Sequence, residues 1–267
     1  MHMETIGYIA SVLIGISLGL VGGGGSILTV PVLVYIFGIS PVVSTSYSLF
    51  IVGSTSLVGA YGNYRRGLVN VKTALFFGLS SMVTVYLTRK LLLPLIPQNL
   101  FHIGHFQVTE PLLTMALFAV LMLAASIGMI SGRQSQPGCL ECDLGRNIVK
   151  LGLSAVGIGL TTGLLGAGGG FLLIPTLVLV LGMPMREAVG TSLLIIALNS
   201  LVGFAGDLGH FVIDWYFLLT VTLVAVAGIF IGGQLARRLD SGQLKKSFGW
   251  FVLAMGCFIL FKELILS

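Results

Sequence analysis

The sequence predicts an all-α polytopic membrane protein built from two inverted repeats, and three observations lead to this prediction. Of its 267 residues, 56% are hydrophobic and 9% are charged, whereas about 25% of the residues of a soluble protein are charged. Four stretches, 5–64, 111–132, 151–185 and 215–236, hold no charged residue, and about 20 apolar residues suffice to cross a bilayer. This composition excludes a water-soluble enzyme. The third observation is an internal repeat.

The repeat appears when the sequence is shifted by 144 positions against itself, which aligns residues 19–70 with residues 163–214 without a gap. The two segments share 18 identities in 52 positions, where about one in ten is expected by chance for such a composition. Farther along the chain the halves have diverged, since Arg89 aligns with Gly233. The predicted organisation is a first membrane repeat over 1–132, a polar linker loop over 133–146 and a second membrane repeat over 147–267.

Each repeat contains five apolar segments. They are 6–20, 26–37, 43–64, 71–93 and 111–130 in the first repeat, and 148–165, 171–181, 188–205, 215–238 and 244–265 in the second. The first two segments of each repeat reach only about 17 to 27 Å, which is short for a hydrocarbon core of about 30 Å. A glycine cluster separates them, and a proline follows it. We therefore predict that each pair forms a broken helical hairpin that leaves the membrane on the side it entered, while the other three segments cross.

The distribution of basic residues predicts the orientation. If each hairpin returns to its own side, each repeat crosses three more times, and the second repeat is inverted. With the loop of Arg65, Arg66 and Lys72 in the cytoplasm, 11 of the 14 basic residues lie inside and 3 outside, whereas parallel repeats give 7 on each side. Cytoplasmic loops are enriched in Lys and Arg, so the count predicts a cell (inner) membrane protein with both termini outside and the 133–146 loop in the cytoplasm. The count equally fits two thin full crossings, and only the short lengths favour the hairpin.

The two glycine clusters are candidate binding sites. A backbone break within the bilayer is costly unless it lines a cavity or is buried in protein, and missing side chains let a ligand approach the backbone. The half-helix after each break points its free N–H groups at the turn, which suits an anion. We expect the two turns to meet near the midplane and to hold a ligand there. The cluster residues are Gly22, Gly23, Gly24, Gly25 and Ser26 in the first repeat, and Gly166, Gly168, Gly169 and Gly170 in the second.

Close helix packing is the alternative role for glycine in a membrane protein. It requires spaced glycines, and we assign this role to Gly15, Gly19, Gly228 and Gly232. Runs of three or four glycines break the helix itself, so the clusters are assigned to the site.

Polar residues inside the apolar segments add further candidates. Hydroxyl groups donate hydrogen bonds to anionic oxygens, and two aligned groups of them lie on the helix after each hairpin. These are Ser46, Tyr47 and Ser48 in the first repeat, and Thr191 and Ser192 in the second. Asn199 is a stronger candidate because a buried carboxamide needs partners. For Ser and Thr the alternative is a bond to their own helix or to a neighbouring helix.

Together these motifs resemble the TauE/SafE family, also called the 4-toluene sulfonate uptake permeases. The resemblance rests on the glycine-rich break followed by Pro in each half, on Ala-Val-Gly-Thr-Ser-Leu at 188–193 with its degenerate partner at 44–49, and on a polar turn ending in Val-Asn or Ile-Asp. It covers nearly the whole chain and implies a transporter of small sulfur-containing anions such as sulfite, thiosulfate or organosulfonates. We expect a secondary or facilitative carrier that works by alternating access. An anion channel with the glycine turns as its filter, and a transporter of small carboxylates, stay open as alternatives.

The remaining polar residues are assigned auxiliary or structural roles. Cys139 and Cys142 form a C-x-x-C pair in the linker and are candidate auxiliary thiols, the alternative being a regulatory or incidental loop. Asp207 is expected in a solvated loop at the outer end, the alternative being a proton relay. Arg65 and Arg66 are assigned to topology, the alternative being that they attract or hold an anion. No metal site, cofactor or nucleic-acid partner is predicted, and the expected partners are the small anion and the lipid bilayer. An intramembrane enzyme is disfavoured because the spans hold no paired acid, base or nucleophile.

Overall fold

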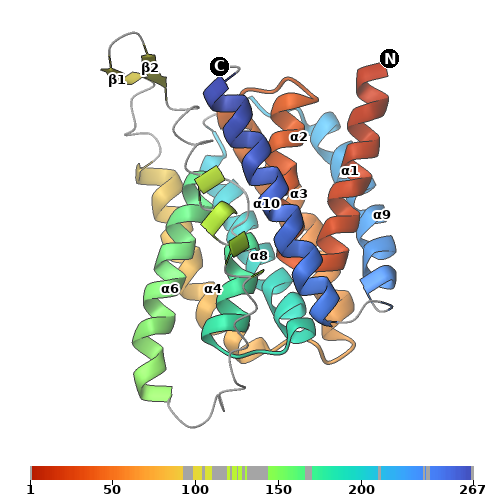
Figure 1. Ribbon diagram of the computed structural model, residues 1–267, viewed down its shortest axis with the longest axis vertical. Coiled ribbons are helices and arrows are strands. Elements are labelled where there is room, and N and C mark those ends of the chain that lie inside the picture. Colours follow the sequence, from red (N-terminus) through yellow and green to blue (C-terminus); the bar gives the residue numbers. More distant parts are fainter. Residues whose placement is uncertain are drawn as a thin grey trace.

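The computed structural model describes residues 2–92, 99–103, 106–109, 119–120, 122–124, 126–127, 130, 144–165, 170–209, 212–236, 238 and 241–265. These residues form a bundle of helices with one small β-hairpin at one end (Figure 1). Much of the predicted segment 111–130 lies outside the described residues.

The elements follow the predicted segments closely. The first half contains α1 (His2–Val21), the 3-10 helix η1 (Gly22–Leu28), α2 (Thr29–Tyr35), α3 (Pro41–Tyr64), α4 (Val71–Leu87) and the π-helix η2 (Thr88–Leu92). An antiparallel pair of strands follows, β1 (Asn99–Ile103) and β2 (Phe106–Thr109). The second half contains α6 (Leu144–Leu165), α7 (Gly170–Pro175), the π-helix η4 (Thr176–Val180), α8 (Met185–Asp207), α9 (Trp215–Ala236) and α10 (Ser241–Ile265).

Helix α1 is longer than the sequence predicts. It begins at His2 rather than at residue 6 and has 20 residues, so it reaches about 30 Å. The predicted length was therefore wrong, although the apolar part of the helix, Gly7–Val21, keeps its short extent.

The chain reverses direction at the first glycine cluster. Gly22 has a φ of +64°, a left-handed conformation that side chains disfavour, and η1 starts at this residue. After α2, the ring of Phe37 lies against the ring of Tyr8 near the start of α1, with 6.4 Å between the ring centroids. The chain has thus returned to the end of the bundle at which α1 begins, as a re-entrant hairpin requires.

Small residues bring α1 into backbone contact with α9. A Cβ added to Gly15 would lie 2.9 Å from the Cα of Gly228, and one added to Gly19 would lie 2.9 Å from the carbonyl carbon of Gly232. Such spacing leaves no room for a side chain on either helix. The predicted packing role of these four glycines is confirmed.

Four helices in the described part of the chain are long and apolar enough to span a membrane, namely α3, Val71–Leu92, α8 and α9. Helices α3 and α8 pack against each other and carry much of the buried core. The outward sides of α4 and α9 are apolar, with exposed Leu79 and Val83 on the one and exposed Leu219 and Leu223 on the other. An apolar surface of this kind is covered by lipid. The protein is an all-α multi-pass membrane protein.

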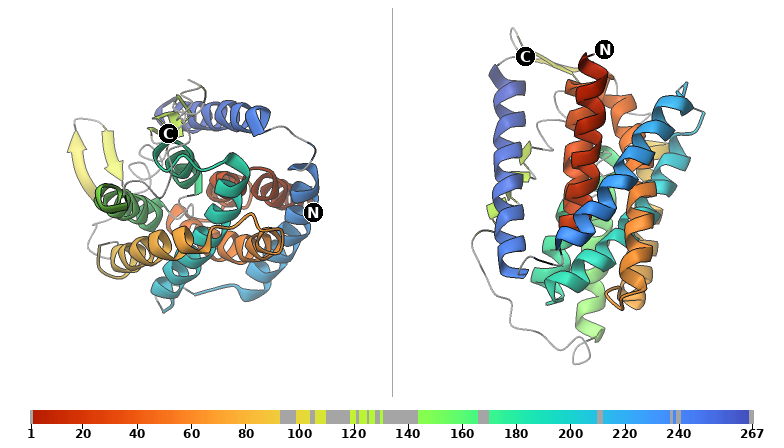
Figure 2. Two further views of the ribbon diagram at one scale, coloured as in Figure 1. Left: turned by 90° about the horizontal axis from the view of Figure 1, so that it is seen from below. Right: turned by 90° about the vertical axis from the view of Figure 1, so that its right-hand side faces the viewer.

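Both chain termini lie at the same end of the bundle, which we call the terminal end (Figures 1 and 2). Helix α3 starts at this end and α8 finishes there, whereas the turn after α3 and the starts of α6, α8 and α10 lie at the opposite end (Figure 1). The end of α3 and the start of α8 meet, since a Cβ added to Gly190 would lie 3.2 Å from the Cβ of Asn63. Helices α3 and α8 therefore run antiparallel.

Contacts between the two halves come in pairs related by the shift of 144 positions. The backbone N–H of Asn70 donates to Thr191 Oγ1 over 3.0 Å, and the aligned N–H of Asp214 donates to Tyr47 Oη over 2.8 Å. Exchanging the halves therefore converts one contact into the other. The same exchange relates two sets of packing glycines, since Gly15 and Gly19 contact α9 whereas their counterparts Gly159 and Gly163 contact α4 and its continuation η2.

Candidate functional site

The two predicted glycine turns meet inside the bundle. Element η1 packs against α7, and a Cβ added to Gly23 would lie 2.6 Å from the Cα of Gly170. A Cβ added to Gly170 would in turn overlap the carbonyl group of Gly23. Gly24 and Gly25 follow within η1, whereas the predicted residues Gly166, Gly168 and Gly169 lie outside the described residues. The structure thus joins the halves at a point where even a methyl group does not fit.

Ser192 and Ser26 lie at the first turn, where their hydroxyl groups bond to nearby backbone. A Cβ added to Gly22 would lie 3.1 Å from Ser192 Oγ, and this hydroxyl donates to the carbonyl oxygen of Val189 over 2.9 Å. Ser26 Oγ donates to the carbonyl oxygen of Gly23 over 2.7 Å. Both hydroxyl protons are therefore used locally in this structure.

A group of buried polar side chains without hydrogen-bond partners lies on α3 and α8, and we call it the polar cluster. Its members are Ser48 Oγ, Thr55 Oγ1 and Ser56 Oγ on α3, and Asn199 Nδ2 and Ser200 Oγ on α8. A Cβ added to Gly53 would lie 3.1 Å from the Cβ of Ser200, so the two helices approach closely here. A buried donor without a partner costs about 1–3 kcal/mol, so these five atoms are candidate contacts for a ligand.

Asn199 connects the polar cluster to the glycine turn. Its Oδ1 accepts a hydrogen bond from Ser81 Oγ over 2.9 Å, while its Nδ2 has no partner. Ile196 lies one helical turn before it, and the Ile196 side chain contacts Gly23. Of the predicted polar candidates, Asn199 and Ser48 are the two whose polar atoms remain unsatisfied.

Tyr47 and Thr191 have a different environment from the one expected of ligand-binding groups. Each accepts the backbone N–H described above, from Asp214 and from Asn70 respectively, and so fixes the turn that precedes α9 or α4. Ser46 is buried on α3. The sequence interpretation missed this anchoring role because the bonds join residues more than 120 positions apart.

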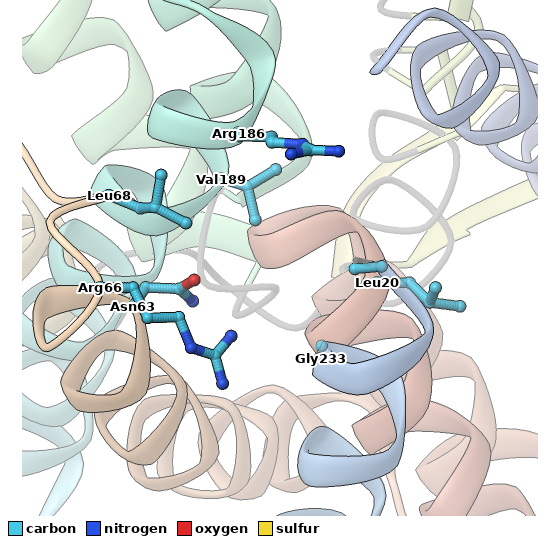
Figure 3. Close-up of a pocket in the computed structure, with 9 residues that line it drawn as sticks. Leu20, Asn63, Arg66, Leu68, Arg186, Val189 and Gly233 are labelled. Atoms are coloured by element: carbon cyan, nitrogen blue, oxygen red, sulfur yellow. The ribbon is translucent and has the colours of Figure 1, made fainter. Parts of the chain in front are cut away.

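A pocket of about 500 Å³ opens at the opposite end of the bundle, and we call it the arginine pocket (Figure 3). Asn63 and Leu68 line one side and Leu20 and Gly233 the other, with Arg66 and Arg186 at its edges (Figure 3). The remaining lining residues are Gly19, Val189 and Ala236. Val189 also lies beside the first glycine turn, since a Cβ added to Gly22 would lie 3.0 Å from Val189 Cγ1.

Arg66 was predicted to set the topology, with attraction of an anion as the alternative, and Arg186 was not singled out. Both lie in loops or first turns, where orientation alone accounts for basic residues. Arg66 follows α3 and Arg186 lies at the start of α8, and only the folded structure brings both to the same pocket.

A buried ion pair lies at the terminal end. Arg89 Nη1 is 2.8 Å from Asp207 Oδ2, and the two side chains are 0% and 4% exposed. The same Nη1 donates to Thr45 Oγ1 over 3.3 Å. The interpretation of Asp207 as a solvated loop residue was wrong, because Arg89 lies within the predicted span 71–93 and a basic residue at that depth recruits a carboxylate.

The C-x-x-C pair of Cys139 and Cys142 lies outside the described residues, so its role stays a prediction. Cys257 on α10 is an exposed free thiol. Within the described ranges no group of His, Cys, Asp and Glu side chains is placed to hold a metal ion.

The polar cluster, the meeting glycine turns and the arginine pocket lie within a chain whose sequence matches a known family along most of its length. A family model described as "Sulfite exporter TauE/SafE" matches residues 8–259. The chain belongs to the TauE/SafE family. The resemblance seen in the sequence motifs is thereby confirmed.

Curated relatives of this TauE/SafE chain carry names of the same kind. A "Probable membrane transporter protein" of Xylella fastidiosa (strain 9a5c) is 27% identical over 255 residues, which cover 94% of this chain and 92% of the relative. The "Probable membrane transporter protein YdhB" of Bacillus subtilis (strain 168) is 26% identical over 249 residues, with coverages of 93% and 97%. No solved structure gives a significant match. The chain is a membrane transporter, and the family and relatives indicate transport rather than catalysis.

Proposed function

We propose that the chain carries small sulfur-containing anions, such as sulfite, thiosulfate or organosulfonates, across the cell membrane by alternating access. The substrate is held between the two glycine turns and the polar cluster. One observation carries this proposal: buried donors of the polar cluster lack partners, and one of them, Asn199, lies one helical turn from Ile196, which contacts Gly23 where the halves meet. Hydroxyl and carboxamide donors match the oxygens of an oxyanion.

The charges of the described interior favour an anion over a cation. Among the described residues the only buried carboxylate is that of Asp207, and Arg89 pairs with it. The arginine pocket adds two positive charges at the route toward the first glycine turn. Positive charges at a cleft raise the local concentration of anions and their rate of entry.

An inverted arrangement of the two halves is part of the proposal. The exchanged contacts and the antiparallel course of α3 and α8 support it. The turn after α3 and the starts of α6, α8 and α10 hold most of the basic residues of the described chain. Because basic loops face the cytoplasm, the opposite end is the cytoplasmic end, and both termini lie outside.

The test of this function is flux through purified protein in lipid vesicles. Labelled sulfite, thiosulfate, taurine-derived sulfonates and small carboxylates are offered separately, and uptake and efflux are followed. Saturable, slow flux of a sulfur anion is expected. Electrical conductance would favour the channel alternative, and preference for carboxylates would overturn the substrate class. No flux of any sulfur anion would contradict the proposal.

Asn199→Leu is expected to lower the transport rate by about 10- to 100-fold. The change keeps the number and branching of the side-chain heavy atoms but removes a donor to the substrate, and a hydrogen bond to a charged group contributes about 1.5–3 kcal/mol. Thr220→Ala is the matched control, because Thr220 Oγ1 lies on the outward part of α9 and bonds only to the carbonyl of Tyr216. Initial uptake rates per folded protein measure the effect, and equal rates for the two variants would remove Asn199 from the site.

Arg66→Gln and Arg186→Gln are each expected to raise the KM for the anion about two- to fivefold, with little change in maximal rate. A charge at the edge of a wet pocket contributes up to about 1 kcal/mol, and salt screens it. Arg65→Gln is the control, because Arg65 is exposed at the same end but does not line the pocket. Transport is measured from the cytoplasmic side at low and high salt. A KM that is unchanged at low salt would show that the pocket is not the entry route.

A further inference from the structure

The buried ion pair and the arginine pocket occupy aligned positions in the two halves. The pocket is lined by three residues whose counterparts, 144 positions away, form the ion pair and its hydrogen bond. The aligned pairs, pocket residue first, are Asn63 with Asp207, Gly233 with Arg89, and Val189 with Thr45. At the opposite end of the bundle these residues line an open pocket, whereas at the terminal end their counterparts form a buried ion pair.

The walls around the two places also correspond. Gly62 lines a small cavity of about 100 Å³ that shares Gly19 and Asn63 with the arginine pocket. Its counterpart Gly206 faces the ion pair, since a Cβ added there would lie 3.4 Å from the Cβ of Arg89. The arginine pocket and the site of the ion pair are therefore built from aligned backbone positions and differ in the side chains that occupy them.

We propose that the Arg89–Asp207 pair is the outer gate of the transporter, closed in this structure, and that Arg89 binds the incoming anion when the gate opens. This proposal rests on the proposed function, since it assumes alternating access and places the terminal end outside. The arginine pocket is then the open cytoplasmic entrance. The neutral counterparts Asn63 and Gly233 cannot form an ion pair, so the cytoplasmic entrance has no equivalent lock.

Arg89 retains the donors that an oxyanion requires. Its Nη1 holds Asp207 and Thr45, but its Nε and Nη2 are buried without partners. A guanidinium group binds an oxyanion best through two parallel N–H donors. An oxyanion bound through Nε and Nη2 therefore keeps the guanidinium group paired when Asp207 moves away, and an unpaired buried charge is the state that costs most.

The gate is tested by thiol labelling from each side of the membrane. In a background of Cys139→Ser, Cys142→Ser and Cys257→Ser, the reporters Thr45→Cys and Val189→Cys mark the two aligned places. A membrane-impermeant maleimide is expected to label the Val189→Cys reporter from the cytoplasmic side and the Thr45→Cys reporter only slowly from outside. Adding Arg89→Gln together with Asp207→Asn, which removes both charges and keeps similar volumes, is expected to raise outside labelling of the Thr45→Cys reporter at least tenfold. Lys90→Gln, an exposed neighbour that bonds to Tyr86, serves as the control and leaves labelling unchanged.

A second variant tests the converse by introducing an ion pair at the entrance that has none. Asn63→Asp with Gly233→Arg places the counterpart pair at the cytoplasmic entrance, where a Cβ at Gly233 meets no atom within 4 Å. We expect cytoplasmic labelling of the Val189→Cys reporter to fall at least tenfold, and the single changes to have smaller effects. If neither pair of changes alters labelling from either side, the gate proposal is overturned.

Binding at Arg89 has its own readout. External sulfite is expected to protect the Thr45→Cys reporter from labelling when Asp207→Asn alone is present, and not when Arg89→Gln is added. Flux is measured on the same variants. Altered labelling without flux of any sulfur anion would contradict the proposed substrate but support the gate. Normal flux with unaltered labelling would contradict the gate alone.

Discussion

Gly23→Leu and Gly170→Leu are each expected to reduce anion transport by about 100-fold or more. At both positions an added side chain meets the backbone of the opposite turn, with Gly170 Cα only 2.6 Å from a Cβ at Gly23. Backbone cannot move aside as a flexible side chain does, and overpacking of this kind costs about 1–3 kcal/mol or more. A cost of about 3 kcal/mol at the transport barrier corresponds to about 100-fold in rate.

The matched control for these variants is Gly157→Leu. Gly157 lies on α6 at an exposed position, and a Cβ added there meets no atom within 4 Å. Flux is normalised to the amount of protein that elutes as a single species in detergent. Full transport by Gly23→Leu and Gly170→Leu would show that the turns are not part of the site.

Gly228→Leu is expected to destabilise the folded protein by about 3 kcal/mol or more. Gly228 lies against α1, and a Cβ added to it would be 3.0 Å from Gly15 Cα and would overlap the carbonyl oxygen of Val12. Helix association in lipid depends on close packing of this kind, and the lost packing is a large part of the total stability of about 5–15 kcal/mol typical of folded proteins.

The measurement for Gly228→Leu is thermal unfolding of the purified protein in detergent, together with the yield of protein in the membrane. Gly233→Leu on the same helix is the control for folding, because a Cβ at Gly233 meets nothing within 4 Å. A similar unfolding temperature for the two variants would show that the contact between α1 and α9 does not stabilise the bundle.

The features that repeat in the sequence were the ones that the sequence predicted well. Glycine runs at aligned positions predicted that the two clusters approach each other, and Gly23 and Gly170 lie in contact. Asn199 was predicted from a general cost, that of burying a carboxamide in an apolar segment. Both inferences needed composition and periodicity but no knowledge of side-chain geometry.

The features that depend on partners from different helices were missed. Asp207 looks solvated in the sequence because it ends a segment, and its burial follows only from the place of Arg89 on another helix. Thr191 accepts the N–H of Asn70, a structural role that its place in the sequence does not reveal. Hydrogen bonds between residues far apart in the sequence depend on how each helix is rotated and how deep it lies in the bundle. Hydropathy encodes neither.

The glycine contacts on either side of the bundle join helices of different repeats. Gly15 and Gly19 attach α1 to α9, and Gly159 and Gly163 attach α6 to α4 and its continuation η2. Close backbone packing therefore pairs helices across the repeats, and these pairs do not coincide with the two halves of the sequence.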